Sequence, residues 1–166
     1  MSGRTTVTKI PETRQLIIER TLSAAVSTVW LSWTRPEHVA RWWGPRGWTT
    51  TVHEMDVRPG GRWRFSMAPT GGGSALVRCV AVYREVQENR RLTYVDAFAD
   101  EMWRTAGEDA GTENFVTFDP AGAATRLTIT THFNSLDELT QAEAMGMVEG
   151  YLEALDRLAA HLTTVA

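Results

Sequence analysis

Between residues 48 and 133 the chain repeats one pattern, in which short runs of alternating apolar and polar residues are separated by turn residues. In RWRFSM (62–67), an aromatic or apolar side chain occupies every second position. Such a period of two predicts a strand with one buried face. The intervening segments 59–61 and 70–74 are rich in Gly, which suits tight turns. Consecutive strands joined by short turns indicate an antiparallel sheet.

The same criteria predict about seven strands, at 14–22, 48–57, 62–67, 75–86, 90–98, 114–120 and 125–133. Two short helices are expected after the first strand, with a corner at 34–36, and the second ends at Gly44-Pro45. Ser135 and Glu138 have the spacing of a capping box, which predicts one long helix continuing to Leu162.

The predicted elements form one α+β domain over residues 14–166, in the order β-α-α-β6-α. Because an antiparallel sheet usually buries one face, the long C-terminal helix is expected to cover it. Residues 1–13 are polar, and we expect them to form a flexible N-terminal tail.

Composition argues against several classes of function. The net charge is −3 and no long basic run occurs, so a nucleic-acid partner is not expected. The first residues lack an apolar signal region and no run approaches the roughly 20 apolar residues of a membrane span, which predicts a cytoplasmic protein. The single cysteine, Cys79, is expected to be a small buried apolar residue. The four histidines lack metal-ligand spacing and no phosphate-binding motif occurs, so neither a metal nor a cofactor is expected.

Five segments together resemble a known family: VWLSWTRPEHVARWWGP (29–45), DVRPGGRWRFSM (56–67), VAVYREVQENRRLTYVDAF (80–98), TRLTITTHF (125–133) and GYLEALDRLAAHL (150–162). The chain resembles the bacterial homologues of the C-terminal domain of the activator of heat-shock protein 90 ATPase. These belong to the START-like (SRPBCC, birch-pollen-allergen-like) superfamily. Tyr151 is a departure, because many relatives have Trp at that position.

The resemblance implies a helix-grip fold, in which a curved antiparallel sheet wraps the C-terminal helix and leaves a cavity between them. Many superfamily members hold an apolar or amphipathic small molecule there, some are cyclases or aromatases, and some have no known ligand. Three functions therefore stay open for this chain. They are binding of an unidentified hydrophobic small molecule, interaction with a chaperone or other protein, and cyclase-like or hydrolase-like catalysis in the same cavity. A monomer and a homodimer are both compatible with the sequence.

Aromatic and Met side chains at strand or helix positions that could turn inward are the candidate cavity lining, with plain core packing as the alternative for each. They are Trp42, Trp43, Trp48, Trp63, Phe65, Tyr83, Tyr94, Phe98, Trp103, Phe115, Met147 and Tyr151. In RWWGPRGW (41–48), adjacent helix residues point about 100° apart. We therefore expect one of Trp42 and Trp43 to plug the core and the other to border the cavity mouth, together with Trp48 or Trp103.

Two carboxylates, Glu54 and Asp96, are candidates for catalysis or for anchoring a ligand. Each is placed on a strand where its side chain could reach the interior, and burial there would raise its pKa. Neutralisation by Arg64 or Arg78 is the structural alternative.

Overall fold

The computed structural model describes residues 5–107 and 111–165, which form one eight-stranded antiparallel sheet and four α-helices. The strand order across the sheet is β1-β2-β8-β7-β6-β5-β4-β3. The elements are β1 (Thr6–Ile10), a 3-10 turn (Pro11–Thr13), β2 (Gln15–Leu22), α1 (Val26–Thr34), α2 (Pro36–Trp42), β3 (Trp48–Met55), β4 (Arg62–Pro69), β5 (Val77–Gln87), β6 (Arg91–Ala99), β7 (Thr112–Ala121), β8 (Ala124–His132), α3 (Leu136–Ala144) and α4 (Met147–Val165).

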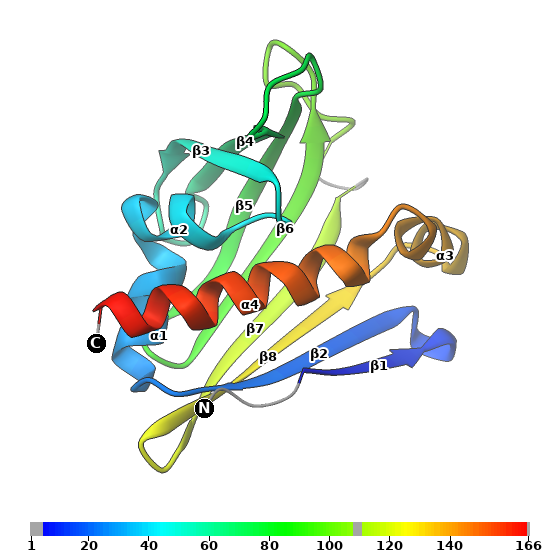
Figure 1. Ribbon diagram of the computed structural model, residues 1–166. Helices are drawn as coiled ribbons and strands as arrows, with labels where there is room; N and C mark the ends of the chain where they lie inside the picture. The colour runs from blue at the N-terminus through cyan, green and yellow to red at the C-terminus, as the bar shows by residue number, and fades with distance from the viewer. Residues whose placement is uncertain (1–4, 108–110, 166) are drawn as a thin grey trace.

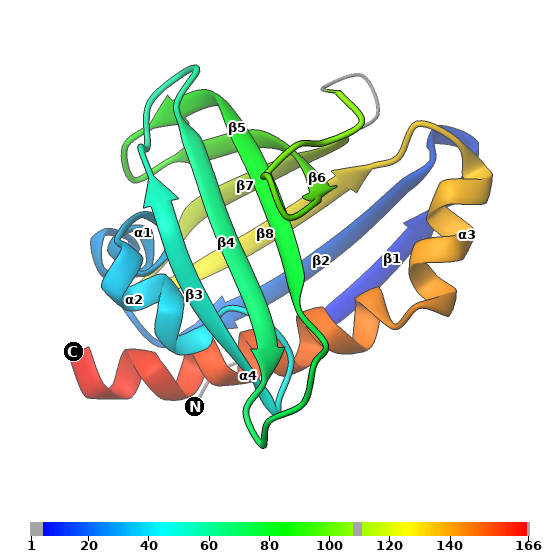
Figure 2. The ribbon, with the colours of Figure 1, turned by 90° about the horizontal axis from the view of Figure 1, so that it is seen from above.

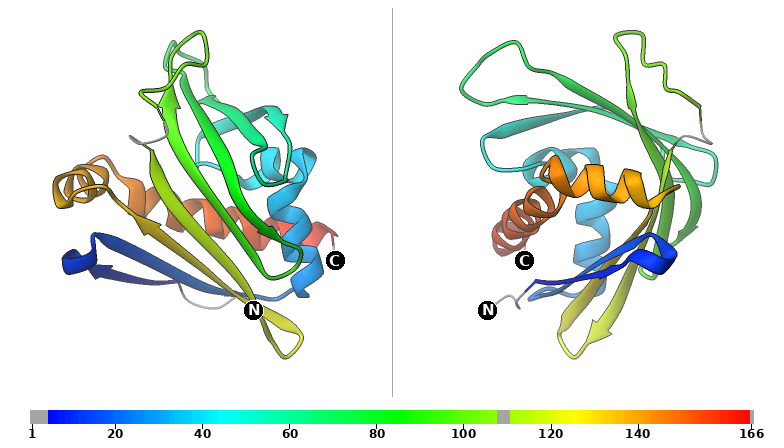
Figure 3. Two further views of the ribbon diagram at one scale, coloured as in Figure 1. Left: turned by 180° about the vertical axis from the view of Figure 1, so that it is seen from behind. Right: turned by 90° about the vertical axis from the view of Figure 1, so that its right-hand side faces the viewer.

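The sheet is curved, and α4 lies across its concave face, as Figures 1 and 3 show. Helices α1 and α2 close the end at which α4 finishes, and α3 lies at the opposite end (Figure 2). Leu155, Leu158 and Leu162 of α4 are 1%, 0% and 3% exposed and belong to the main core. This arrangement confirms the expected α+β helix-grip fold. Among the described helices, none is long and apolar enough to cross a membrane.

The sheet has one more strand than the sequence predicted. Residues Thr6–Ile10, assigned to a flexible tail, instead form β1, which pairs with β2 along its whole length. The side chains of this edge strand are largely exposed. No apolar alternation is therefore required, and the sequence pattern could not reveal the strand. The part of the expected tail at residues 1–4 lies outside the described residues.

The predicted long C-terminal helix is two helices. Gly146 adopts a φ of +90°, which ends the helical path between α3 and α4. Ser135 does cap α3 as predicted, since its Oγ accepts a hydrogen bond of 3.1 Å from the backbone N–H of Glu138. The break was missed because apolar residues continue across it without a change of spacing.

Candidate functional site on the inner face of the sheet

The tryptophans of RWWGPRGW point in two directions. Trp42 is fully buried against α1, where its indole N–H donates to the Ser32 carbonyl oxygen over 2.8 Å. Trp43 instead faces the concave sheet, with its ring centroid 4.9 Å from that of Trp63 and 6.1 Å from that of Tyr151. Trp43 is 8% exposed. Both rings belong to the main core and lie 5.3 Å apart, with Trp42 beneath α1 and Trp43 packed between it and the concave face of the sheet.

Arg157 of α4 holds the chain in this corner. Its Nη1 donates to the carbonyl oxygens of Trp43, Gly44, Pro45 and Trp48, at distances of 2.9 to 3.4 Å. Its Nη2 donates to the carbonyl oxygen of Arg41 over 3.2 Å. Carbonyl groups at a helix C-terminus carry partial negative charge, which suits a guanidinium. The Gly-Pro break after α2 is thus fixed by a side chain from the far end of the sequence.

Register places a group of aromatic side chains on the inner face of the sheet. Strand partners that face each other in an antiparallel pair share one face, so the pairs Phe65–Cys79, Trp63–Ala81 and Tyr83–Tyr94 define it. Trp63, Phe65, Tyr83 and Tyr94 are each 1–2% exposed. Figure 3 shows α4 lying inside the curve formed by these strands.

The inner face opens to solvent along β6. Alternate residues of this strand point inward, and Tyr94 is 1% exposed, Asp96 is partly exposed and Phe98 is 68% exposed. Phe98 therefore lies on the expected face of the strand, but at its open end rather than within an enclosed wall. Exposure on this face therefore increases from Tyr94 toward the end of β6 at Phe98, and we call this exposed end the opening.

A polar cluster lies at this opening. The amide of Asn114 on β7 donates through Nδ2 to Asp96 Oδ1 over 3.0 Å, and Thr131 Oγ1 of β8 donates to Asn114 Oδ1 over 3.0 Å. This chain of bonds fixes the amide with its NH₂ group toward the carboxyl. Burial raises the pKa of Asp96 to about 6, although the bond from Asn114 opposes the shift.

The titratable neighbours of Asp96 stay uncharged at neutral pH. Burial raises the pKa of Cys79 to about 12, and the charge of Asp96 adds to that shift. Burial likewise raises the pKa of Tyr94 and of Tyr151, with the charge of Asp96 contributing to both. Asp96 is thus an ionisable carboxyl among neutral hydroxyl, thiol and amide groups.

Glu54, the other candidate carboxylate, faces the opposite way. A β-bulge between Val52 and Glu54 shifts the register, so that Val52 pairs with Phe65 but Glu54 pairs with Arg64. The extra residue reverses the alternation and turns Glu54 to the outer face. There its Oε1 lies 2.8 Å from Arg64 Nε in an ion pair. The expectation that Glu54 could reach the interior was wrong, and the alternative of neutralisation by Arg64 is confirmed.

Two candidate lining residues also lie on the outer face. Phe115 pairs with Thr93 and Thr130, one position out of step with the inward-facing Asn114. The Trp103 ring lies 4.9 Å from that of His53, and the guanidinium carbons of Arg64 and Arg78 lie 5.3 and 5.9 Å from its centroid. Neither borders the interior, because the register assigns their surroundings to the convex side.

The remaining candidates lie nearer the interior. Trp48 begins β3, two residues before the buried Thr50, and is partly exposed. Met147 begins α4 and packs on the small cluster of Leu16, Phe133 and Leu139.

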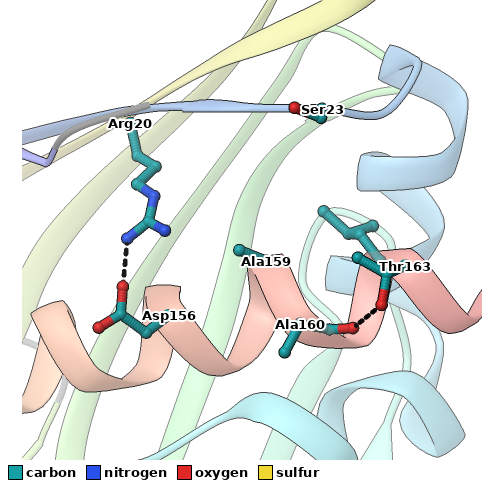
Figure 4. Close-up of a pocket in the computed structure, with 7 residues that line it drawn as sticks. Arg20, Ser23, Asp156, Ala159, Ala160 and Thr163 are labelled. Carbon is teal, nitrogen blue, oxygen red and sulfur yellow. Dashed lines mark hydrogen bonds and ion pairs between the residues drawn. The ribbon is translucent and has the colours of Figure 1, made fainter. Parts of the chain in front are cut away.

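A separate groove of about 350 Å³ lies between the end of β2 and the C-terminal half of α4 (Figure 4). An ion pair crosses it, with Arg20 Nη1 2.6 Å from Asp156 Oδ1. The other lining residues are mainly small, namely Ser23, Ala159, Ala160, Leu162 and Thr163. Its charged groups, Arg20 and Asp156, pair with each other. Because β8 and β7 separate β2 from β6, this groove is distinct from the Asp96 site.

Folding also joins two histidines that the sequence keeps apart. His38 Nδ1 and His161 Nε2 lie 2.8 Å apart between α2 and α4. Burial lowers the pKa of His161, and the nearby His38 and Arg41 lower it further. Over the described ranges, no group of three or more His, Cys, Asp or Glu side chains is arranged to hold a metal ion. No sequence spacing could have indicated this pair, because it depends on how α4 crosses α2.

Comparison with known protein families shows to which family the chain belongs. The model of the family described as Activator of Hsp90 ATPase homolog 1-like protein matches residues 23–163. The chain belongs to this family. A solved structure from Arthrobacter aurescens is 30% identical, with a TM-score of 0.88 over 96% of this chain and 91% of that one. A structure from Mycobacterium smegmatis is 28% identical, with a TM-score of 0.85 over 95% and 96% of the two chains. No curated protein sequence matches the chain.

Proposed function

We propose that this protein binds a small apolar or amphipathic molecule on the inner face of the sheet, between β5–β8 and the first turns of α4. The observation that carries the proposal is the opening along β6, where a buried aromatic wall meets a partly exposed polar cluster. Small-molecule sites generally combine apolar walls with a few placed polar groups. Membership in the family supports the proposal, because its fold is used for ligand binding in related proteins.

Buried polar atoms on the wall add support. Within the described residues, the Trp63 indole nitrogen and the Tyr83 hydroxyl have no hydrogen-bond partner. Both side chains are at most 2% exposed. Because an unmade buried hydrogen bond is costly, such groups suit a site in which a ligand or water completes them.

Titration with N-phenyl-1-naphthylamine, a neutral apolar fluorophore, tests the proposal. We expect emission enhancement and quenching of tryptophan on binding, with energy transfer from Trp43 and Trp63. Trp43→Phe should weaken the response, because its ring faces Trp63 and Tyr151. The matched variant Trp30→Phe should lower thermal stability but leave the probe affinity unchanged, because its ring packs on Phe118 and makes no ring contact with Trp43 among the described residues. Absence of saturable binding by the folded protein would refute the proposal.

A further inference from the structure

Asp96 is a carboxyl group that has no basic partner. Across residues 5–107 and 111–165, its side-chain bond is the one from the Asn114 amide, and no Lys or Arg forms an ion pair with it. Asn114 is itself bonded to Thr131, which orients its NH₂ group toward the carboxyl. A partly buried carboxylate without a cation is costly to the fold, which marks the position as one that an outside group could complete.

The groups that pack around Asp96 add no charge of their own. Its cross-strand partners are Ala81 on β5 and Thr112 on β7, and Asn114 donates a hydrogen bond to it. Cys79, Tyr94 and Tyr151 lie close enough for the charge of Asp96 to raise their pKa values. Those that titrate have pKa values raised far above neutrality. Asp96 is therefore the source of negative charge in this part of the interior.

Aromatic rings lie on the same face of the sheet as Asp96. Ala81 is the cross-strand neighbour of both Asp96 and Trp63, and its small side chain leaves the Trp63 ring next to the carboxyl's strand. Tyr94 and Tyr151 flank the site, and the exposed Phe98 stands at its opening. Aromatic faces attract cations through their quadrupole, most strongly where water is excluded.

We propose that the site selects ligands in which a protonated amine is attached to an apolar group, with the ammonium on Asp96 and the apolar part along Trp63, Phe65 and Tyr151. This inference rests on the proposed function and names the chemical class of its ligand. A carboxylate or phosphate ligand would be repelled by Asp96, and a neutral alcohol would gain the apolar contacts without the ion pair.

Two probes of matched shape separate these cases. 4-Phenylbutylamine is protonated at pH 8, as a lysine side chain is, and 4-phenylbutan-1-ol replaces the ammonium by a hydroxyl group. Binding of each is measured by calorimetry or by displacement of N-phenyl-1-naphthylamine. A hydrogen bond to a charged group predicts an affinity for the amine about 10- to 100-fold higher than for the alcohol.

Asp96→Asn should remove this preference while leaving the alcohol affinity within about twofold, because the new amide oxygen still accepts from Asn114. Glu113→Gln is the matched control, since it removes one negative charge from an exposed position of β7 and should change neither affinity. In the unmodified protein, the preference for the amine should also decline as the pH falls from 8 to 5, because Asp96 becomes protonated near pH 6. That titration keeps the test decisive if Asp96→Asn fails to fold.

The outcomes distinguish this inference from the proposed function. Equal affinities for amine and alcohol, unchanged by pH, would overturn the assignment of an amine ligand while leaving small-molecule binding supported. A preference for the amine that survives Asp96→Asn would also overturn it. If neither compound nor the fluorophore binds, the proposed function fails together with the inference.

Discussion

Replacement of Arg157 by Met tests whether the Gly-Pro corner depends on α4. The guanidinium donates to five backbone carbonyl oxygens of residues 41–48, but Nη1 reaches four of them with two hydrogens, so the contacts amount to about three full hydrogen bonds. Charge-assisted bonds contribute about 1.5–3 kcal/mol each, and water can reach this half-buried side chain to replace part of that. We therefore expect a loss of about 3 kcal/mol in the free energy of unfolding.

For a chain of this size, a loss of that magnitude lowers Tm by about 6–12 °C. Thermal or urea denaturation followed by circular dichroism measures the change, and near-ultraviolet signals report whether the tryptophans of the corner loosen. Arg157→Lys keeps the charge but not the planar fork, so it should recover less than half of the loss. Arg90→Met, at an exposed position in the β5–β6 turn, should stay within about 0.5 kcal/mol of the unmodified protein. An Arg157→Met variant as stable as Arg90→Met would refute the anchoring role.

Three further outcomes follow from burial and charge. Leu155→Ala should lower the free energy of unfolding by about 2–5 kcal/mol in urea denaturation, because the side chain is 1% exposed between α4 and the sheet. Unchanged stability would show that α4 does not pack tightly against the sheet. Asp96→Asn should stabilise the protein by about 1–3 kcal/mol at pH 8. The raised pKa means that the folded state takes up a proton as the pH falls from about 6 to 4, so this advantage should disappear by pH 4; an advantage constant with pH would contradict the burial of its charge. His161→Gln should remove a loss of stability that the unmodified protein shows as the pH falls below about 6.5, because the lowered pKa of His161 favours its uncharged form in the folded state. Identical pH profiles in urea denaturation would exclude that contribution.

The alternation of apolar and polar residues was sufficient to predict which side chains face the interior, wherever that alternation along a strand was unbroken. Trp63, Phe65 and Tyr94 were predicted to face the interior and do so, because each strand continues without an inserted residue around them. In NFVTFDP (114–120), aromatic residues occur at both odd and even positions, and Phe115 was predicted to face the interior. The register turns Asn114 inward instead. The polar residue that breaks the apolar pattern is the one in the candidate site, as is common at functional positions.

The order of β2 to β8, with two helices after β2, and the identity of the helix that crosses the sheet were determined by the sequence alone, because hydrophobic periodicity and turn chemistry act over a few residues. Strand β1 and the break between α3 and α4 at Gly146 were not. The partners of Asp96, the outward turn of Glu54, the contact between His38 and His161 and the anchoring of the corner by Arg157 were decided only by the tertiary structure. Each depends on strand register, on one bulge or on the crossing of α4 over distant segments. These are set by the packing of the whole core, and no local spacing encodes them.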